Sequence, residues 1–292
     1  FAAAVNIASA PTGLIIPPSG ILIIYPVLAG CSVVGMIMSG YIPGLMWALA
    51  CMVVAYVIAK KNHYPTAGKV PASVFFKYFV DAIPSLLLIV IVIGGILGGV
   101  FTATEGSAIA VVYSLVLSAV YRSIKIKDLP KILLDACETT AVIMFLIAGS
   151  NVMSFVMSFT GLPSAIGNAL ISVSSNKYVI LLIINLVLLV VGCFMDITPA
   201  VLIFTPIFLP VVQSFGMDPI HFGIMMVMNL GIGNITPPVG SALFSGCSVA
   251  DMDMEDMIKP ILPFYAAIFV ALMLVAYVPW FSMALPTLFG AV

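Results

Sequence analysis

Long runs without a charged residue constrain this chain more than any other feature of its sequence. No Asp, Glu, Lys or Arg occurs before Lys60, between Ala82 and Thr104, between Thr139 and Asn176, or after Lys259. A helix needs about 20 apolar residues to cross a ~30 Å hydrocarbon core, and these runs are long enough. The chain is 63% hydrophobic and only 7% charged, whereas soluble domains carry about 25% charged residues. The sequence therefore predicts an all-α polytopic membrane protein.

The charged loops divide the chain into expected helices and indicate its orientation. We expect spans at 40–59, 83–100, 105–121, 139–159 and 260–281, and a short interfacial helix in "TGLPSAIGNALISVSSNK". "TATE", Thr102 to Glu105, has the spacing of a capping box and predicts a helix start. The loops at 60–77 and 122–131 hold eight of the ten basic residues, and two spans separate them. Both loops should therefore lie on the cytoplasmic side.

Several residue types point to no catalytic or metal chemistry. The five cysteines are scattered singly, and His63 and His221 form no metal-spaced cluster with acidic residues. There is no GxSxG motif and there are no paired carboxylates in the apolar runs, so we do not expect an enzyme. The net charge of −1 implies no polyanion partner. "GGILGG", Gly94 to Gly99, allows close helix packing, either with another subunit or within the chain.

Two apolar stretches contain helix breakers in the middle. "GLIIPPSG" runs from Gly13 to Gly20 and "GNITPPVG" from Gly233 to Gly240. Proline removes a backbone donor and leaves carbonyls unpaired, which costs several kcal/mol in lipid unless protein, water or an ion satisfies them. Freed carbonyls can bind a hard cation such as Na⁺, and the N–H groups of the next half-helix can bind an anion. An ordinary proline kink is the alternative for each break taken alone.

The two breaks belong to longer similar segments. "FAAAVNIASAPTGLIIPPSG" resembles "FGIMMVMNLGIGNITPPVG"; "GCSV" recurs at Gly30 and Gly246, and "MVVAYV" at Met52 recurs as "MLVAYV" at Met273. Counting crossings from the basic loops places the two copies in opposite orientations. Inverted repeats with broken helices are typical of secondary transporters, whose site lies near the bilayer midplane.

Asp196 is the only charged residue between Lys177 and Asp218. Its flanking arms, 178–192 and 199–213, reach about 22 Å each as helices, short of a ~30 Å span. We expect a re-entrant hairpin with Asp196 near its tip; two short true spans, with Asp196 as an ordinary helix cap, are the alternative. A carboxylate at membrane depth needs a partner, and Na⁺ or a substrate hydroxyl is the natural one here.

These stretches, together with "GGVFTATEGSAIAVVY", "FMDITPAVLIFTPIFLP" and "HFGIMMVMNLGIGNITPPVG", resemble the large membrane subunit of tripartite ATP-independent periplasmic (TRAP) transporters. The resemblance covers nearly the whole chain. It implies a bacterial or archaeal inner-membrane protein that imports organic acids, such as sialic acid or four-carbon dicarboxylates, with two or more Na⁺ ions. It also implies a small four-helix membrane subunit, a periplasmic substrate-binding protein, and an elevator in which a transport domain slides against a scaffold.

The resemblance also suggests site residues. It implies sodium ligands in two groups, one at each break, and a substrate vestibule near the hairpin tip. The sodium ligands are Ser9, Thr12, Gly13, Ile16 and Pro18 at the first break, and Gly192, Thr198, Gly233, Thr236 and Pro238 at the second. The substrate residues are Asp196, Ser19, Ser32 and Asn234. Since the only arginine is Arg122, in a basic loop, a substrate carboxylate would rely on half-helix N-termini, hydroxyls and the cation.

The expected domain organisation follows the same resemblance. Residues 1–38 and 178–250 form the transport-domain parts of the two repeats; 39–138, 139–177 and 251–292 form scaffold helices and connections. The family's first hairpin would lie upstream of Phe1, so we expect the chain to be part of a longer protein. A stand-alone sodium–dicarboxylate symporter or exchanger, an intramembrane enzyme and a channel remain competing functions.

Overall fold

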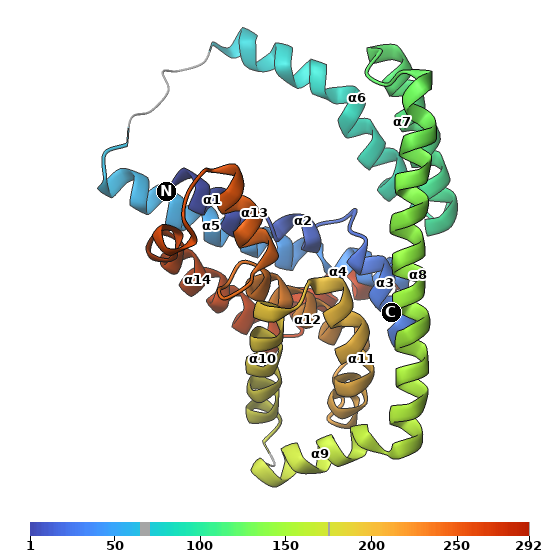
Figure 1. The fold of residues 1–292 in the computed structure, drawn as a ribbon, viewed down its shortest axis with the longest axis vertical. Coiled ribbons are helices and arrows are strands. Elements are labelled where there is room, and N and C mark those ends of the chain that lie inside the picture. Colours follow the sequence, from blue (N-terminus) through green and yellow to red (C-terminus); the bar gives the residue numbers. More distant parts are fainter. Residues whose placement is uncertain (65–70, 175, 292) are drawn as a thin grey trace. The chain divides into compact units, whose positions relative to one another are not determined.

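The computed structural model describes residues 1–64, 71–174 and 176–291, and these form helices joined by short connections (Figure 1). Seven helical segments in this part of the chain are long and apolar enough to cross a membrane. Lys69 of the first basic loop lies outside the described residues. The helices are α1 Ala2–Ser9, α2 Thr12–Ile15, α3 Ile21–Ala29, α4 Val33–Ser39, α5 Tyr41–Lys61, α6 Ala72–Leu97, α7 Ala103–Tyr121, η1 Ile126–Asp128, α8 Leu129–Thr160, α9 Leu162–Val173, α10 Lys177–Phe194, α11 Ile197–Ser214, α12 Pro219–Asn234, α13 Ser241–Val249, α14 Met254–Tyr277 and α15 Trp280–Leu288.

The chain divides into two compact units. The first comprises residues 1–61 and 146–292, and the second comprises residues 62–145. In the second unit α6 packs against α7, and the Tyr113 hydroxyl donates to the Pro84 carbonyl at 2.7 Å. A β-carbon on Gly95 would overlap the Phe101 ring, so this glycine of "GGILGG" serves packing within the chain.

Helix α12 lies at the centre of the first unit, and its residues from Ile220 to Asn234 are all buried. It packs against α10, α11 and α14, which surround it in Figure 1, and also against α2, α3, α4 and α15. The sequence explains this position, because the helix has no charged residue and only a few polar ones, and therefore has no face suited to water. It carries one of the two breaks at its end.

Three expected helix boundaries were wrong in the same direction. Helix α6 begins at Ala72 rather than 83, α8 at Leu129 rather than 139, and α14 at Met254 rather than 260. Each helix includes charged residues ahead of the expected membrane span, since charged side chains are compatible with helix outside the apolar part. The expected capping box is confirmed: the Glu105 amide donates to Thr102 Oγ1 at 3.3 Å, and the Thr102 amide donates to Glu105 at 2.8 Å. The expected short helix is α9.

Both double-proline stretches interrupt the helices as expected. After each, a nine-residue helix begins three residues beyond the second proline: α3 at Ile21 and α13 at Ser241. "GCSV" does not occupy matching places, because Gly30 follows α3 whereas Gly246 lies within α13. Helices α5 and α14, expected in a scaffold, pack against α1 and against each other within the first unit.

Candidate functional site

The second double-proline stretch separates α12 from α13. Helix α12 ends at Asn234 and α13 begins at Ser241. Pro237 and Pro238 between them supply no amide hydrogen, so the helical hydrogen-bond ladder stops here. The intervening residues are then free to take up other backbone conformations and to contact neighbouring elements.

Side-chain hydroxyls satisfy two carbonyl oxygens beside this break. The Thr236 hydroxyl donates to the Ile232 carbonyl at 2.6 Å. The Tyr265 hydroxyl, on α14, donates to the Ile235 carbonyl. Sequence reasoning missed Tyr265, because it lies in a different helix and its neighbours in the chain give no sign of the contact.

The tip of the hairpin formed by α10 and α11 packs against this break. Figure 1 shows the two helices side by side with their joined ends beside α12. The amides of Val239 and Gly240 donate to the Cys193 carbonyl at 3.2 and 3.3 Å. Gly192 and Gly233 touch beside them, since a β-carbon on Gly233 would lie 2.5 Å from the Gly192 Cα. The structure thus brings together two of the predicted residues, and close backbone approach explains why both are glycine.

We expect Gly233→Ala to lower the Tm of the purified protein and its uptake activity. Overpacking costs about 1–3 kcal/mol, and here the added carbon meets backbone atoms that cannot rotate away. Gly149→Ala is the matched control, because nothing lies within 4 Å of a β-carbon there. Thermal unfolding in detergent and uptake in membranes compare the two variants; a Gly233→Ala protein with wild-type values for both would contradict the close packing.

An exposed carboxylate, Asp196, lies at the hairpin tip and faces the start of α13. The Ser241 hydroxyl lies 3.3 Å from Asp196 Oδ1 and 2.5 Å from Asn234 Oδ1. The Ala242 amide also points to Asn234 Oδ1, at 3.4 Å. Because a hydroxyl has a single hydrogen, Ser241 donates to one of its two acceptors at a time. The three side chains form the cluster that we call the Asp196 cluster.

Two predicted substrate residues, Asp196 and Asn234, are therefore joined by a residue that sequence reasoning missed. Ser241 is the first residue of the half-helix after the break. Ser241 could have been identified from this position in the sequence, since a hydroxyl at the start of a half-helix lies beside backbone groups that have no helical partner. The cluster presents oxygen acceptors without a basic residue, which suits a cation or a ligand hydroxyl.

The first double-proline stretch is held by different partners. The Ser19 hydroxyl donates to the Leu14 carbonyl at 2.6 Å, inside the break. The Trp47 indole N–H, on α5, donates to the Ala8 carbonyl at 2.9 Å. Ile16 packs so closely on α5 that a β-carbon on Gly44 would overlap it. Trp47, like Tyr265, is a side chain from another helix that donates to a backbone carbonyl of a broken segment.

Thr12 is the predicted sodium residue whose surroundings most favour a cation. Its Oγ1 is buried and has no hydrogen-bond partner among the described residues. A buried polar atom left unsatisfied costs about 1–3 kcal/mol, so such an oxygen fits a hard cation. The Ser9 hydroxyl, by contrast, donates to the Asn6 carbonyl at 3.0 Å. Gly13 and Pro18 are exposed.

The remaining predicted sodium and substrate residues have fewer contacts with the two breaks and with the Asp196 cluster. Ser32 caps α4, accepting from the Gly35 amide at 3.0 Å. Within the described residues no hydrogen bond joins Ser32 or Ser19 to the Asp196 cluster. Thr198 is half-buried in the first turn of α11, and Pro238 is exposed in the second break. The structure therefore gathers the predicted set around two neighbouring breaks rather than into one shell.

The two broken segments lie against each other. Helix α1 packs against α13, where a β-carbon on Gly246 would overlap Ile7, and α2 and α3 pack against α12. A further buried oxygen lies between α10 and α12: the Asn229 amide donates to Asn185 Oδ1 at 2.5 Å, while Asn229 Oδ1 has no partner among the described residues. Among the residues that the structure describes, no group of three or more His, Cys, Asp or Glu is arranged to bind a metal ion. The available donors are neutral oxygens and one carboxylate, which hard cations prefer.

Comparison with known proteins gives a consistent result. The model of the family described as "Tripartite ATP-independent periplasmic transporter, DctM component" matches residues 1–281. The chain is 53% identical to the uncharacterized protein YgiK of Salmonella typhimurium, over 99% of the chain and 67% of that protein. It is 38% identical to the sialic acid TRAP transporter large permease protein SiaM of Vibrio cholerae and 36% identical to the C4-dicarboxylate TRAP transporter large permease protein DctM of Pseudomonas aeruginosa. Each of these two matches covers 99% of the chain and 68% of the relative.

Proposed function

Because the chain belongs to the DctM component family of tripartite ATP-independent periplasmic transporters, we propose that it couples Na⁺ entry to the import of an organic acid. It is a multi-pass inner-membrane permease subunit and not an enzyme, in keeping with its relatives and its apolar helices. The observation that carries the proposal is the hairpin tip packed on a broken helix, with the Asp196 cluster at the contact. A solute bound there contacts the hairpin tip and the break, where backbone groups are outside the helices and can bind a ligand.

The proposed substrate class follows from the relatives and from the charges at the cluster. SiaM is named for sialic acid and DctM for C4-dicarboxylates, and both solutes are organic acids. Asp196 repels a carboxylate directly, so it serves a substrate hydroxyl or a bound cation. The substrate carboxylate then relies on Na⁺ and on the amides at the start of α13. Because Na⁺ contacts the substrate carboxylate in this arrangement, binding of the acid depends on sodium.

We propose that the first break forms one sodium site around Thr12 and that the second forms another around Gly192, Gly233 and Thr236. Support for the first is the buried, unpartnered Thr12 Oγ1. Support for the second is the close backbone approach of Gly192 and Gly233 where the hairpin tip packs on the break. Peptide and hydroxyl oxygens are suitable Na⁺ ligands because the ion is hard and forms no directional bonds.

We expect Thr12→Val to weaken Na⁺ binding by about tenfold while leaving the sodium-free protein as stable as wild type or more stable. Valine has nearly the same shape but lacks the hydroxyl whose burial costs about 1–3 kcal/mol. Thr12→Ser, which keeps the oxygen, is the matched control and should retain most of the affinity. Thermal unfolding measured over a range of Na⁺ concentrations reports both quantities. Equal sodium responses in Thr12→Val and wild type would remove this site.

The proposed transport mechanism is an elevator built on two inverted repeats. Both breaks precede a nine-residue half-helix, and α1 of the first segment packs against α13 of the second. The arms of the proposed re-entrant hairpin are longer than the expected 178–192 and 199–213, because α10 and α11 have 18 residues each and both are long enough to cross a membrane. Its tip packs on the break between α12 and α13, which is the contact that the re-entrant arrangement uses. Gathering both breaks in one compact unit is what a transport domain requires.

The proposed partners are a small four-helix membrane subunit and a periplasmic binding protein that delivers the acid. The test is reconstitution of the full-length protein with these two partners, using labelled sialic acid and labelled succinate as probes. We expect accumulation above the external concentration only with an inward Na⁺ gradient and only with a binding protein. Transport without a binding protein would favour a stand-alone symporter, and equilibration without accumulation would favour a channel.

A further inference from the structure

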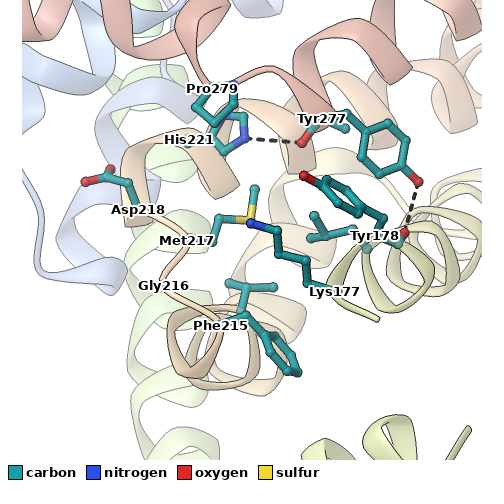
Figure 2. Close-up of a pocket in the computed structure, with 12 residues that line it drawn as sticks. Lys177, Tyr178, Phe215, Gly216, Met217, Asp218, His221, Tyr277 and Pro279 are labelled. Atoms are coloured by element: carbon teal, nitrogen blue, oxygen red, sulfur yellow. Dashed lines mark hydrogen bonds between the residues drawn. The ribbon is translucent and has the colours of Figure 1, made fainter. Parts of the chain in front are cut away.

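A pocket lies at the end of the α10–α11 hairpin opposite to the Asp196 cluster. It is formed where α10 begins, α11 ends, α12 begins and α14 ends, all within the first compact unit. Figure 2 shows Lys177 and Tyr178 from α10 together with Phe215, Met217, His221 and Tyr277 around this space. We call it the Lys177 pocket. Its volume is about 240 Å³.

The residues at the pocket mark the level of a membrane–water interface. Lys177 and Tyr178 open the candidate span α10, and Tyr277 closes the candidate span α14. The Tyr178 and Tyr277 rings lie 5.8 Å apart, and the Tyr277 hydroxyl donates to the Tyr178 carbonyl at 3.1 Å. Trp280 follows at the start of α15 and is exposed. Aromatic and basic residues at the ends of apolar helices lie at lipid headgroup depth.

Among the described residues, Lys177 is the one lysine that lines the pocket. The Lys177 ammonium lies 5.2 Å from the centre of the Tyr178 ring, and within the described residues it forms no salt bridge. Figure 2 shows its side chain extending among the residues that line the pocket. Asp218 lines the same space, but its carboxylate accepts from the Ile220 amide at 2.7 Å and points away from Lys177.

The His221 ring and the Tyr277 hydroxyl already have hydrogen-bond partners. His221 is buried, with Nδ1 2.6 Å from the Ser282 hydroxyl and Nε2 3.3 Å from the Ala276 carbonyl. The remaining walls are apolar, contributed by Leu181, Val212, Phe215, Met217 and Pro279. The pocket thus offers one unpaired ammonium among apolar and aromatic surfaces, which favours an anionic group attached to a hydrocarbon body.

We propose that the Lys177 pocket binds the phosphate of a membrane phospholipid headgroup. The phosphate pairs with the Lys177 ammonium, and the glycerol and upper acyl carbons lie against the apolar walls. A phospholipid is favoured over a soluble acid because the pocket lies at the ends of the apolar helices α10 and α14, at the depth where phosphates of the bilayer are concentrated. A lipid bound there holds the ends of α10 and α14 together at the base of the hairpin.

The test is native mass spectrometry of the full-length protein with phosphatidylglycerol, and with diacylglycerol carrying the same acyl chains. We expect retention of phosphatidylglycerol but not diacylglycerol. Lys177→Gln should lower the phosphatidylglycerol affinity at least about tenfold, since hydrogen bonds to charged groups are the stronger class. Lys177→Arg should restore it. Lys259→Gln, which removes an exposed lysine from α14 outside the pocket, is the matched control and should bind as wild type does.

Two outcomes would overturn the proposal. One is equal phosphatidylglycerol retention in Lys177→Gln and wild type, with circular dichroism confirming that both are folded. The other is competition: if inorganic phosphate or succinate binds at Lys177 and phosphatidylglycerol does not displace it, the pocket is a site for soluble anions. A Lys177→Gln protein that fails to fold leaves Lys177→Arg and Tyr277→Phe as the informative variants. Loss of selective phosphatidylglycerol binding in Lys177→Arg would then contradict a phosphate contact.

Discussion

Replacing Asp196 by alanine should lower organic-acid uptake by about 10- to 150-fold without unfolding the protein. The carboxylate is exposed at the hairpin tip, so its removal leaves no buried group unpaired. It lies beside Ser241 and Asn234, where a substrate hydroxyl or a cation would be bound. Hydrogen bonds to charged groups contribute about 1.5–3 kcal/mol, which corresponds to the stated range.

The control for this variant is Asp135→Ala, which removes an exposed carboxylate on α8 that belongs to the second compact unit. It should transport as wild type does. Initial uptake rates of labelled acid, corrected for the amount of protein in the membrane, compare the two. Ser241→Ala should give a smaller loss than Asp196→Ala, since it removes a neutral group. Wild-type uptake by Asp196→Ala would remove this carboxylate from the site.

Replacing Pro237 and Pro238 together by alanine should strongly reduce the dependence of transport on sodium. Alanine restores two amide hydrogens and favours helix, so the break can close and its carbonyls return to helical hydrogen bonds. Closing it also removes the Val239 and Gly240 amides from the Cys193 carbonyl and so detaches the hairpin tip. We expect the Na⁺ concentration for half-maximal uptake to rise at least about tenfold, or uptake to be lost.

Pro210→Ala provides the comparison for the double variant. Pro210 lies inside the continuous helix α11, so its replacement by alanine changes the same residue type without closing a break. It should keep the sodium response of wild type. Uptake rates measured across a series of Na⁺ concentrations distinguish the variants. An unchanged sodium response in the double-proline variant would favour an ordinary kink.

The sequence predicted the architecture better than it predicted the contacts. The charge-free runs indicated the membrane helices because length and composition alone decide whether a helix can cross lipid. The proline pairs located both breaks, and the lone Asp196 located the hairpin tip. These features are local, and each depends on a few adjacent residues.

The contacts that build the site are not local. Tyr265 donates to the Ile235 carbonyl in the second break, and Trp47 donates to the Ala8 carbonyl in α1, each from a helix distant in the sequence. Ser241 joins Asp196 to Asn234 only where the hairpin tip packs on the second break. The reason that Gly233 is glycine is equally tertiary, since a β-carbon there would overlap the backbone of Gly192. Helix boundaries failed where a charged segment continued a helix beyond its apolar part, because charge signals the edge of the membrane rather than the end of the helix.

Direct sodium binding to the purified, substrate-free protein tests the central claim. Equilibrium binding of ²²Na⁺ should be saturable in wild type, weaker in Thr12→Val, and weaker again when Pro237 and Pro238 are also replaced by alanine. The loss in the combined variant should exceed either loss alone, since each change removes a different site. Wild-type protein that binds no sodium, or sodium binding indifferent to both changes, would contradict the account.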